Sequence, residues 1–183
     1  FKDYDPLTRE RLNKWRKTLE RLRSGEKIEM LNYWSKIRRF MKSETVGAVA
    51  IDKDCNIAAG TSSGGFPMKL PGRVGDVPLI GCSTYAKNGV GGTSLSGQGE
   101  IIMRLLLAKE ICDLMERGIS AQKTIEAIVD QVNKSFGVNT LIAGITLDKN
   151  GNVGVARNVR LFPHASMHDG LDEVRVGFGP VIR

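Results

Sequence analysis

Residues 45–76 read TVGAVAIDKDCNIAAGTSSGGFPMKLPGRVGD, and this stretch decides how the whole sequence is interpreted. It opens with two short apolar runs of small and β-branched residues, at 46–51 and 56–61. Lys53 and Asp54 separate the two runs and supply the polar residues of a turn. Apolar runs of this length on either side of a polar turn predict a β-hairpin.

Downstream of the hairpin, the sequence shows two glycine-rich stretches. Residues 62–75 are polar and rich in glycine, and residues 87–99 are again rich in glycine and in hydroxyl-bearing residues. Between them, Leu79, Ile80 and Gly81 form a short apolar run that we expect to be a strand.

The second half of the chain contains two helical patterns followed by strand patterns. The first helix is predicted over 100–117, and the second follows Ser120, a suitable N-cap, and ends near Ser135. Three further strands are expected at 140–147, 153–156 and 174–178, with a tight turn at 149–151. This order predicts an α+β fold, in which helices cover a sheet, rather than a repeating βαβ unit.

The net charge of +7 comes almost entirely from residues 1–44, which carry 13 Lys and Arg against 7 Asp and Glu. Residues 6–42 show two amphipathic helical patterns, with Leu12 and Trp15 in the first apolar stripe. Such a basic pair is typical either of a nucleic-acid or acidic-surface binder or of a helical hairpin that buries its stripes. Because the aromatic residues lie on the apolar stripes, burial is favoured and no nucleic-acid partner is expected.

The composition argues against several classes of protein. No apolar run approaches the roughly 20 residues of a spanning helix, so no membrane partner is expected. Three scattered cysteines are too few for a disulfide framework, which favours a reducing, cytoplasmic compartment. His164 and His168 have the i, i+4 spacing of helical metal ligands, but their surroundings show no helical periodicity and no obvious third ligand. A surface loop without a metal is therefore expected there.

Four short motifs stand out between residues 45 and 100. They are Thr45-Val-Gly-Ala-Val-Ala, Thr61-Ser-Ser-Gly-Gly, Gly72-Arg-Val-Gly-Asp and Ser96-Gly-Gln-Gly-Glu. Each motif alone is common in a strand, a turn, a surface ion pair or a loop. A glycine-rich loop before a helix can also hold a phosphate, but no Gly-Lys-Ser/Thr completes a P-loop here. The specific signal is their order and spacing together.

Taken together, the motifs resemble the β-subunit of the plant-type asparaginase family, which includes the isoaspartyl peptidases and has the glycosylasparaginases and threonine aspartases as relatives. The resemblance runs from Thr45 to about Gly154. It implies the four-layer αββα sandwich of the N-terminal nucleophile hydrolases, incomplete here because the first half of the family's precursor is missing. Residues 1–44 would then be a basic helical linker that ends the α-part, and residues 45–183 the β-subunit.

The resemblance also sets expectations for partners and cofactors. An α-subunit from the same precursor, with its own strands and helices, would complete the core, and two αβ units would form a dimer. The family's structural sodium ion belongs to the α-part, so no cofactor is expected for this chain.

The resemblance makes Thr45 the catalytic nucleophile. A threonine hydroxyl is a poor nucleophile unless a base takes its proton. In this family the base is the free α-amine of the same threonine, and an unperturbed α-amine has a pKa of about 7.7–8.0, which suits proton transfer near neutral pH. That amine exists only after the Glu44–Thr45 bond is cut. The chain must therefore first cleave itself at this bond.

Three further residues would support the nucleophile. Ser63 stands at the family's supporting threonine, and Ser96 and Gly97 stand at its oxyanion hole, a hydroxyl and a backbone N–H. Serine replaces threonine at positions 63 and 96, which keeps the hydroxyl and removes a methyl group. Glu44 stands where glycine is common, so the rate of cleavage is expected to differ from that of relatives.

Three residues would bind the substrate. Arg73 stands at the arginine that holds the α-carboxylate, a task that suits a planar guanidinium. Asp76 stands at the acid that holds the α-ammonium, and Gly99 at a backbone contact. Together they would select an aspartyl head group, which is a small-molecule substrate.

The resemblance therefore implies a threonine-type amidohydrolase, made as a zymogen, that hydrolyses L-asparagine or β-aspartyl (isoaspartyl) peptides through an acyl-enzyme. A glycosylasparaginase and a threonine-aspartase-like protease are alternatives. Ser62 and Ser63 resemble the second, whereas Asp76 favours a substrate with a free amino group. A binding protein that uses residues 1–44 and has a lapsed hydrolase body is the other alternative, and the retained hydroxyls, Arg73 and Asp76 count against it.

Overall fold

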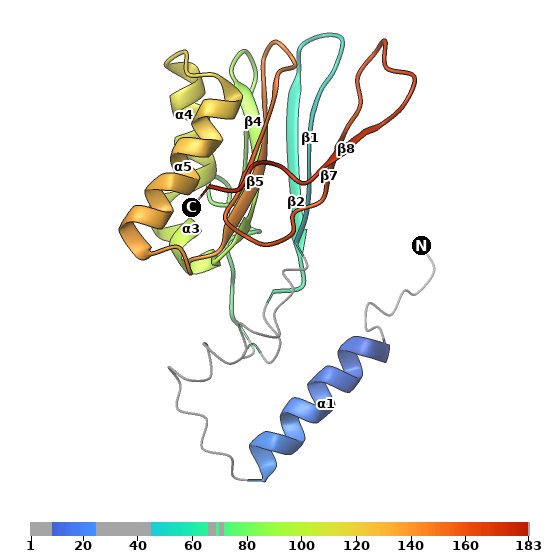
Figure 1. Ribbon diagram of the computed structural model, residues 1–183, viewed down its shortest axis with the longest axis vertical. Coiled ribbons are helices and arrows are strands. Elements are labelled where there is room, and N and C mark those ends of the chain that lie inside the picture. The colour runs from blue at the N-terminus through green and yellow to red at the C-terminus, as the bar shows by residue number, and fades with distance from the viewer. Residues whose placement is uncertain (1–8, 25–44, 66–68, 70–71, 183) are drawn as a thin grey trace. The chain divides into compact units, whose positions relative to one another are not determined.

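The computed structural model describes residues 9–24, 45–65, 69 and 72–182, which belong to two compact units (Figure 1). The first unit combines 1–42 with 65–73, and the second combines 43–64 with 74–183. In the first unit, helix α1 spans Arg9–Arg23, in agreement with the first helical pattern of the sequence. The second predicted helix of that segment lies outside the described residues.

The second unit contains helices and antiparallel sheets, which confirms the α+β class. Strand β1 (Thr45–Ile51) pairs with β2 (Ile57–Ser63) in a two-stranded sheet. A four-stranded sheet has the order β3-β4-β5-β6, from Thr84–Lys87, Gly91–Gly97, Ile142–Asp148 and Val153–Arg157. A third sheet pairs β7 (His164–Ser166) with β8 (Arg175–Gly177). The helices are α3 (Gly99–Leu105), α4 (Leu107–Glu116) and α5 (Ala121–Phe136).

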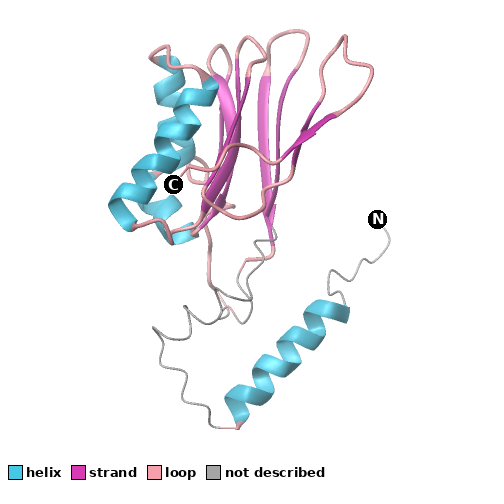
Figure 2. Ribbon diagram, viewed as in Figure 1, coloured by secondary structure: helices cyan, strands magenta, loops and turns pink. Residues whose placement is uncertain are grey.

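The four-stranded sheet lies between helices and the β1–β2 hairpin (Figures 1 and 2). Helices α4 and α5 cover one face, and between that face and the helices lies the main apolar core, where Leu95, Ile111 and Ile128 are at most 1% exposed. The hairpin packs on the opposite face of the sheet. No helix in the described part of the chain has the length and apolar character needed to cross a membrane.

Strand β4 lies within the glycine-rich stretch 87–99, for which the sequence predicted no strand. The strand occupies the middle of the four-stranded sheet, and Gly91–Leu95 are all buried. Its glycines reflect close packing rather than a turn, because a Cβ on Gly91 would lie 2.6 Å from the carbonyl oxygen of Leu147 and 2.7 Å from Met115 Cε. A strand that is buried on both faces shows no polar–apolar alternation, so the pattern of a half-buried strand is missing.

Two other predictions are wrong in detail. Residues 79–81 form turns with a single bridge from Ile80 to Thr84, and the strand of this region is β3. The helix predicted over 100–117 is interrupted at Leu106, which has a φ of 49° and separates α3 from α4. Nothing in the sequence announces this break, since neither glycine nor proline marks it.

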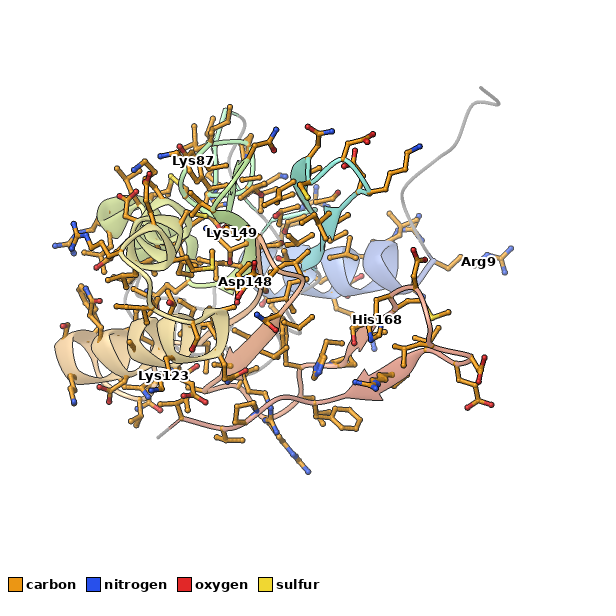
Figure 3. All side chains as sticks on the ribbon, turned by 90° about the horizontal axis from the view of Figure 1, so that it is seen from above. Arg9, Lys87, Lys123, Asp148, Lys149 and His168 are labelled. Carbon is orange, nitrogen blue, oxygen red and sulfur yellow. The ribbon has the colours of Figure 1, made fainter. Side chains whose placement is uncertain are left out.

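Two hairpin turns share one hydrogen-bonding pattern. In the β1–β2 turn, Asp52 accepts backbone N–H bonds from Asp54 and Asn56 at 2.9 and 2.8 Å. In the β5–β6 turn, Asp148 accepts the equivalent bonds from Asn150 and Asn152 at 2.9 Å each. Asp148 and Lys149 lie together in this second turn (Figure 3). Both turns agree with the sequence prediction.

Candidate active site

Thr45 is the first residue of β1 and lies directly opposite Ser63, the last residue of β2. Both side chains are half-buried. The antiparallel register of the hairpin therefore brings these two predicted site residues together at one end of the second unit. Glu44, the other residue of the predicted cleavage site, lies outside the described residues.

Strand β1 of the hairpin packs on β4, and every second residue of β1 faces every second residue of β4. A Cβ on Gly92 would lie 3.0 Å from Val49 Cγ1, and a Cβ on Gly47 would overlap the hydroxyl of Ser94. Because strand side chains alternate, two residues further along each strand Thr45 comes to face Ser96. Both residues line the same cavity. The missing side chain of Gly47 is what lets the two strands approach this closely.

Ser96 and Gly97 end β4, and Gly99 begins α3 only two residues later. Gly97 is tightly enclosed, since a Cβ there would lie 2.9 Å from the Cα of Ile142. At Gly99, a Cβ would overlap the carboxylate of Asp76. Only glycine therefore allows Asp76 to lie against the start of this helix.

Asp76 is held by a short hydrogen bond from the hydroxyl of Ser83, which directly precedes β3. Asp76 is half-buried, and Ser83 is fully buried. The pKa of the neighbouring Cys82 thiol is raised, first by burial and second by the charge of Asp76. Asp76 thus lies on the β3 side of the sheet.

Arg73 is the last residue of the first unit. It is half-buried, and Nη1 would lie 3.2 Å from a Cβ placed on Gly65 of the same unit. The second unit therefore brings together Thr45, Ser63, Asp76, Ser96, Gly97 and Gly99, and Arg73 is not among them.

A cavity of about 280 Å³ lies beside Thr45. Its wall is formed by the start of β1, by Ser94 and Ser96 of β4, by Ile145 of β5, and by residues 162–165. His164 belongs to this wall, so the prediction of a surface loop is wrong for this histidine, which is half-buried in β7. His168 is exposed on the segment after β7, as predicted (Figure 3). Within the described residues, no group of three side chains has the composition of a metal site.

A chain of hydroxyl groups reaches the same cavity and was not predicted from the sequence. Thr84 donates a short hydrogen bond to Thr61, and the Oγ1 of Thr61 lies 2.7 Å from the Oγ of Ser94. Ser94 is 4% exposed and belongs to the cavity wall. The available signal was the spacing of hydroxyls at 61 and 63 and at 94 and 96, which places each pair on one face of its strand.

The sequence pattern of the asparaginase family matches residues 1–175 of this chain. The chain belongs to the asparaginase family. The resemblance that its four motifs indicated, to plant-type asparaginases and isoaspartyl peptidases, is thereby confirmed.

Individual members of the asparaginase family are similar over much of the chain. A plant-type L-asparaginase of Pyrococcus horikoshii is 42% identical over 97% of this chain, and the match covers 58% of that protein. The plant-type L-asparaginase of Pyrococcus furiosus is 41% identical, with the same coverages of 97% and 58%. An isoaspartyl peptidase of Escherichia coli is 43% identical over 64% of this chain and 36% of its own length. The chain thus spans 58% of the length of these Pyrococcus relatives.

Proposed function

We propose that this chain is the larger part of an amidohydrolase that matures by cleavage between Glu44 and Thr45. The mature protein would hydrolyse L-asparagine or β-aspartyl peptides through an acyl-enzyme on Thr45. The observation that carries the proposal is the position of Thr45 at the start of β1, opposite Ser63 and facing Ser96 at a cavity. The names of the relatives support the choice of substrates.

Maturation would begin when the hydroxyl of Thr45 attacks the carbonyl carbon of Glu44. The C–N bond to Thr45 breaks, the hydroxyl proton passes to the departing nitrogen, and an ester joins the two residues. Water then hydrolyses this ester. The products are a new carboxylate on Glu44 and a free α-amine on Thr45, which is the base that the hydroxyl needs.

Turnover would repeat the same chemistry on a substrate. The α-amine of Thr45 takes the hydroxyl proton, and the hydroxyl oxygen attacks the side-chain carbonyl of the aspartyl group. The hydroxyl of Ser96 and the N–H of Gly97 would stabilise the oxyanion. The proton passes to the leaving nitrogen, and water hydrolyses the acyl-enzyme. Ser63, across the hairpin from Thr45, would orient the nucleophile.

Recognition of the substrate would rest on charge. Asp76, seated against Gly99, would bind the α-ammonium, and Arg73 would bind the α-carboxylate through a bidentate contact. The α-part of the same precursor would add the fourth layer of the αββα sandwich to the helices, sheet and hairpin of the second unit, and the αβ units would pair as dimers. We expect no metal in the chemical steps.

The test is the mass of the purified protein over time, followed by activity measurements. We expect a break that leaves Thr45 as a new N-terminus, and release of aspartate from asparagine or β-aspartyl dipeptides afterwards. Thr45→Ala should abolish both events, whereas Thr45→Ser, which keeps a hydroxyl, should retain part of each. Cleavage or hydrolysis that persists in Thr45→Ala would contradict the proposal.

A further inference from the structure

Ser83 is a fully buried polar residue that directly precedes β3. Its hydroxyl donates a short hydrogen bond to Oδ2 of Asp76, the residue proposed to bind the substrate α-ammonium. Its carbonyl oxygen accepts a hydrogen bond of 2.8 Å from the backbone N–H of Leu95. Leu95 directly precedes Ser96 on β4. One residue therefore joins the proposed ammonium site to the strand that carries the proposed oxyanion donor.

The carboxylate of Asp76 depends on its neighbours for a fixed position. Asp76 lies on the bends and turns that precede β3, where its backbone carbonyl accepts a local hydrogen bond of 3.2 Å from Leu79. Segments of this kind are more mobile than the strands of a sheet. At the side chain, Oδ2 accepts the bond from Ser83, and Oδ1 lies against Gly99, where an added Cβ would overlap it. Because both oxygens are in contact, the plane of the carboxylate is fixed.

Leu95 supplies the rigid end of this connection, since it is 1% exposed and belongs to an interior strand of the four-stranded sheet. A substrate whose ammonium is held at Asp76 must place its side-chain carbonyl at Ser96 and Gly97. Small misplacements of a bound substrate lower its rate steeply, so the distance between the two sites matters. Ser83 fixes this distance, because it is bonded at both ends.

We propose that Ser83 is a positioning residue, which holds Asp76 for the substrate α-ammonium and thereby favours substrates that carry a free amino group. A carboxylate has about four lone-pair positions and the hydroxyl occupies one of them, so Asp76 can still bind a cation. Ser83 acts through Asp76 and does not itself touch the substrate. This inference rests on the proposed function and deepens it, because it assigns part of the substrate selection to a buried residue that the sequence did not indicate.

The experiment compares each substrate with the analogue that lacks its α-amino group, succinamate for asparagine and N-succinyl-alanine for β-Asp-Ala. In matured full-length protein, Ser83→Ala should lower kcat/KM for the amino substrates by about tenfold, mainly through KM, because the carboxylate loses its fixed position. It should leave kcat/KM for the analogues within about twofold of the wild type, so the ratio of substrate to analogue falls about tenfold. Where hydrolysis of an analogue is too slow to measure, inhibition by L-aspartate is compared with inhibition by succinate.

Thr93→Val is the matched control. Thr93 is fully buried on β4, and its hydroxyl donates to the carbonyl oxygen of Ile145 at 2.8 Å rather than to Asp76. The substitution removes a buried hydrogen bond of the same sheet and should leave the ratio as in the wild type. Ser83→Cys, whose thiol has a similar shape but is a weak donor, should give a ratio between those of the wild type and Ser83→Ala.

A double substitution tests whether Ser83 acts through Asp76. Asp76→Ala alone should lower the ratio at least as much as Ser83→Ala does. Adding Ser83→Ala to Asp76→Ala should change the ratio no further, because the group that Ser83 positions is already gone. A further fall in the double variant would show that Ser83 affects the substrate by another route, which contradicts the proposal.

The positioning role is overturned if Ser83→Ala keeps the wild-type ratio, or if it lowers substrate and analogue equally. If only Ser83→Cys matures, its ratio decides in the same way. Failure of both Ser83 variants to mature would assign the residue to folding instead and would overturn the role as well. If the matured wild type hydrolyses neither asparagine nor β-Asp-Ala, the proposed function fails first, and the role of Ser83 with it.

Discussion

Strands β1 and β4 are both built from small and apolar residues, yet their surroundings differ completely. In β4, Gly91–Leu95 are buried between the helices and the hairpin, and Leu95 is 1% exposed. In β1, one face packs on β4 and the other is open, with Val46 68% exposed. Similar composition therefore gives a central strand in one case and an outer strand in the other.

The difference matters because the candidate site takes residues from both strands. Ser96 lies on the strand that is fixed on both faces, and Thr45 on the strand that is supported on one face. In the proposed mechanism, a nucleophile that first cleaves its own peptide bond would need local freedom, while donors to an oxyanion would need fixed positions. The different support of the two strands is consistent with that proposal.

The largest expected effect comes from removing apolar atoms from β4. Leu95→Ala should lower the free energy of unfolding by about 2–5 kcal/mol, because a cavity remains among helix side chains. Val46→Ala, on the open face of β1, should change it by about 0.5 kcal/mol or less. Denaturant unfolding of both variants measures the contrast. Similar losses at the two positions would show that the open face of β1 is covered in the whole protein.

A second contrast uses the same substitution on glycines of the two layers. Gly91→Ala places a Cβ 2.6 Å from a backbone carbonyl oxygen and should destabilise the protein by about 2–3 kcal/mol. Gly60 of β2 has no atom within 4 Å of the equivalent position, and Gly60→Ala should be neutral or stabilise by up to about 1 kcal/mol. Thermal unfolding reports both changes. A tolerated Gly91→Ala would mean that β4 and β5 separate more easily than their packing indicates.

Some helices and strands could be predicted from local sequence patterns alone. The β1–β2 hairpin and helix α5 agree with the prediction because their apolar periodicity and turn residues are local. Ser120 stands at the N-cap of α5 as expected, but its side chain makes no capping hydrogen bond, and its carbonyl instead accepts one from Thr124 at 2.9 Å. The sequence thus predicted where α5 begins, but not which hydrogen bonds Ser120 makes.

Other features depend on contacts between distant segments. Strand β4 lacks alternation because two different layers cover its faces. The approach of Asp76 to Gly99 and of residues 162–165 to Thr45 follows from how strands are ordered, which no single motif encodes. The family resemblance placed Thr45, Ser63 and Ser96 in one site. It assigned no role to Thr61, Ser94 or His164, although the hydroxyl spacing at 61 and 63 and at 94 and 96 was an available signal for the first two.

A third, smaller effect is expected from the hydroxyl contact that joins the hairpin to β4. Thr61→Val keeps the shape of the side chain but leaves the buried hydroxyl of Ser94 without its partner at 2.7 Å. The loss should be about 1–2 kcal/mol in unfolding free energy. Thr61→Ser, which keeps the hydroxyl, is the control and should lose less. Equal losses in the two variants would assign the effect to the methyl group rather than to the hydrogen bond.

The smallest effect concerns the turns that close the two hairpins. Cys55 and Gly151 occupy the same position in the matching turns, and both have positive φ, 62° and 81°. Cys55 is exposed, so its side chain contributes no burial that offsets the strain of a left-handed conformation. Cys55→Gly should therefore stabilise the protein by about 0.5–1 kcal/mol, and Gly151→Ala should destabilise it by a similar amount.

Thermal unfolding of the two variants in parallel tests whether the β1–β2 hairpin unfolds cooperatively with the rest of the second unit. If Cys55→Gly stabilises the β1–β2 hairpin but leaves the midpoint of the main thermal unfolding transition unchanged, then this hairpin, and Thr45 with it, unfolds separately from the sheet that carries Ser96.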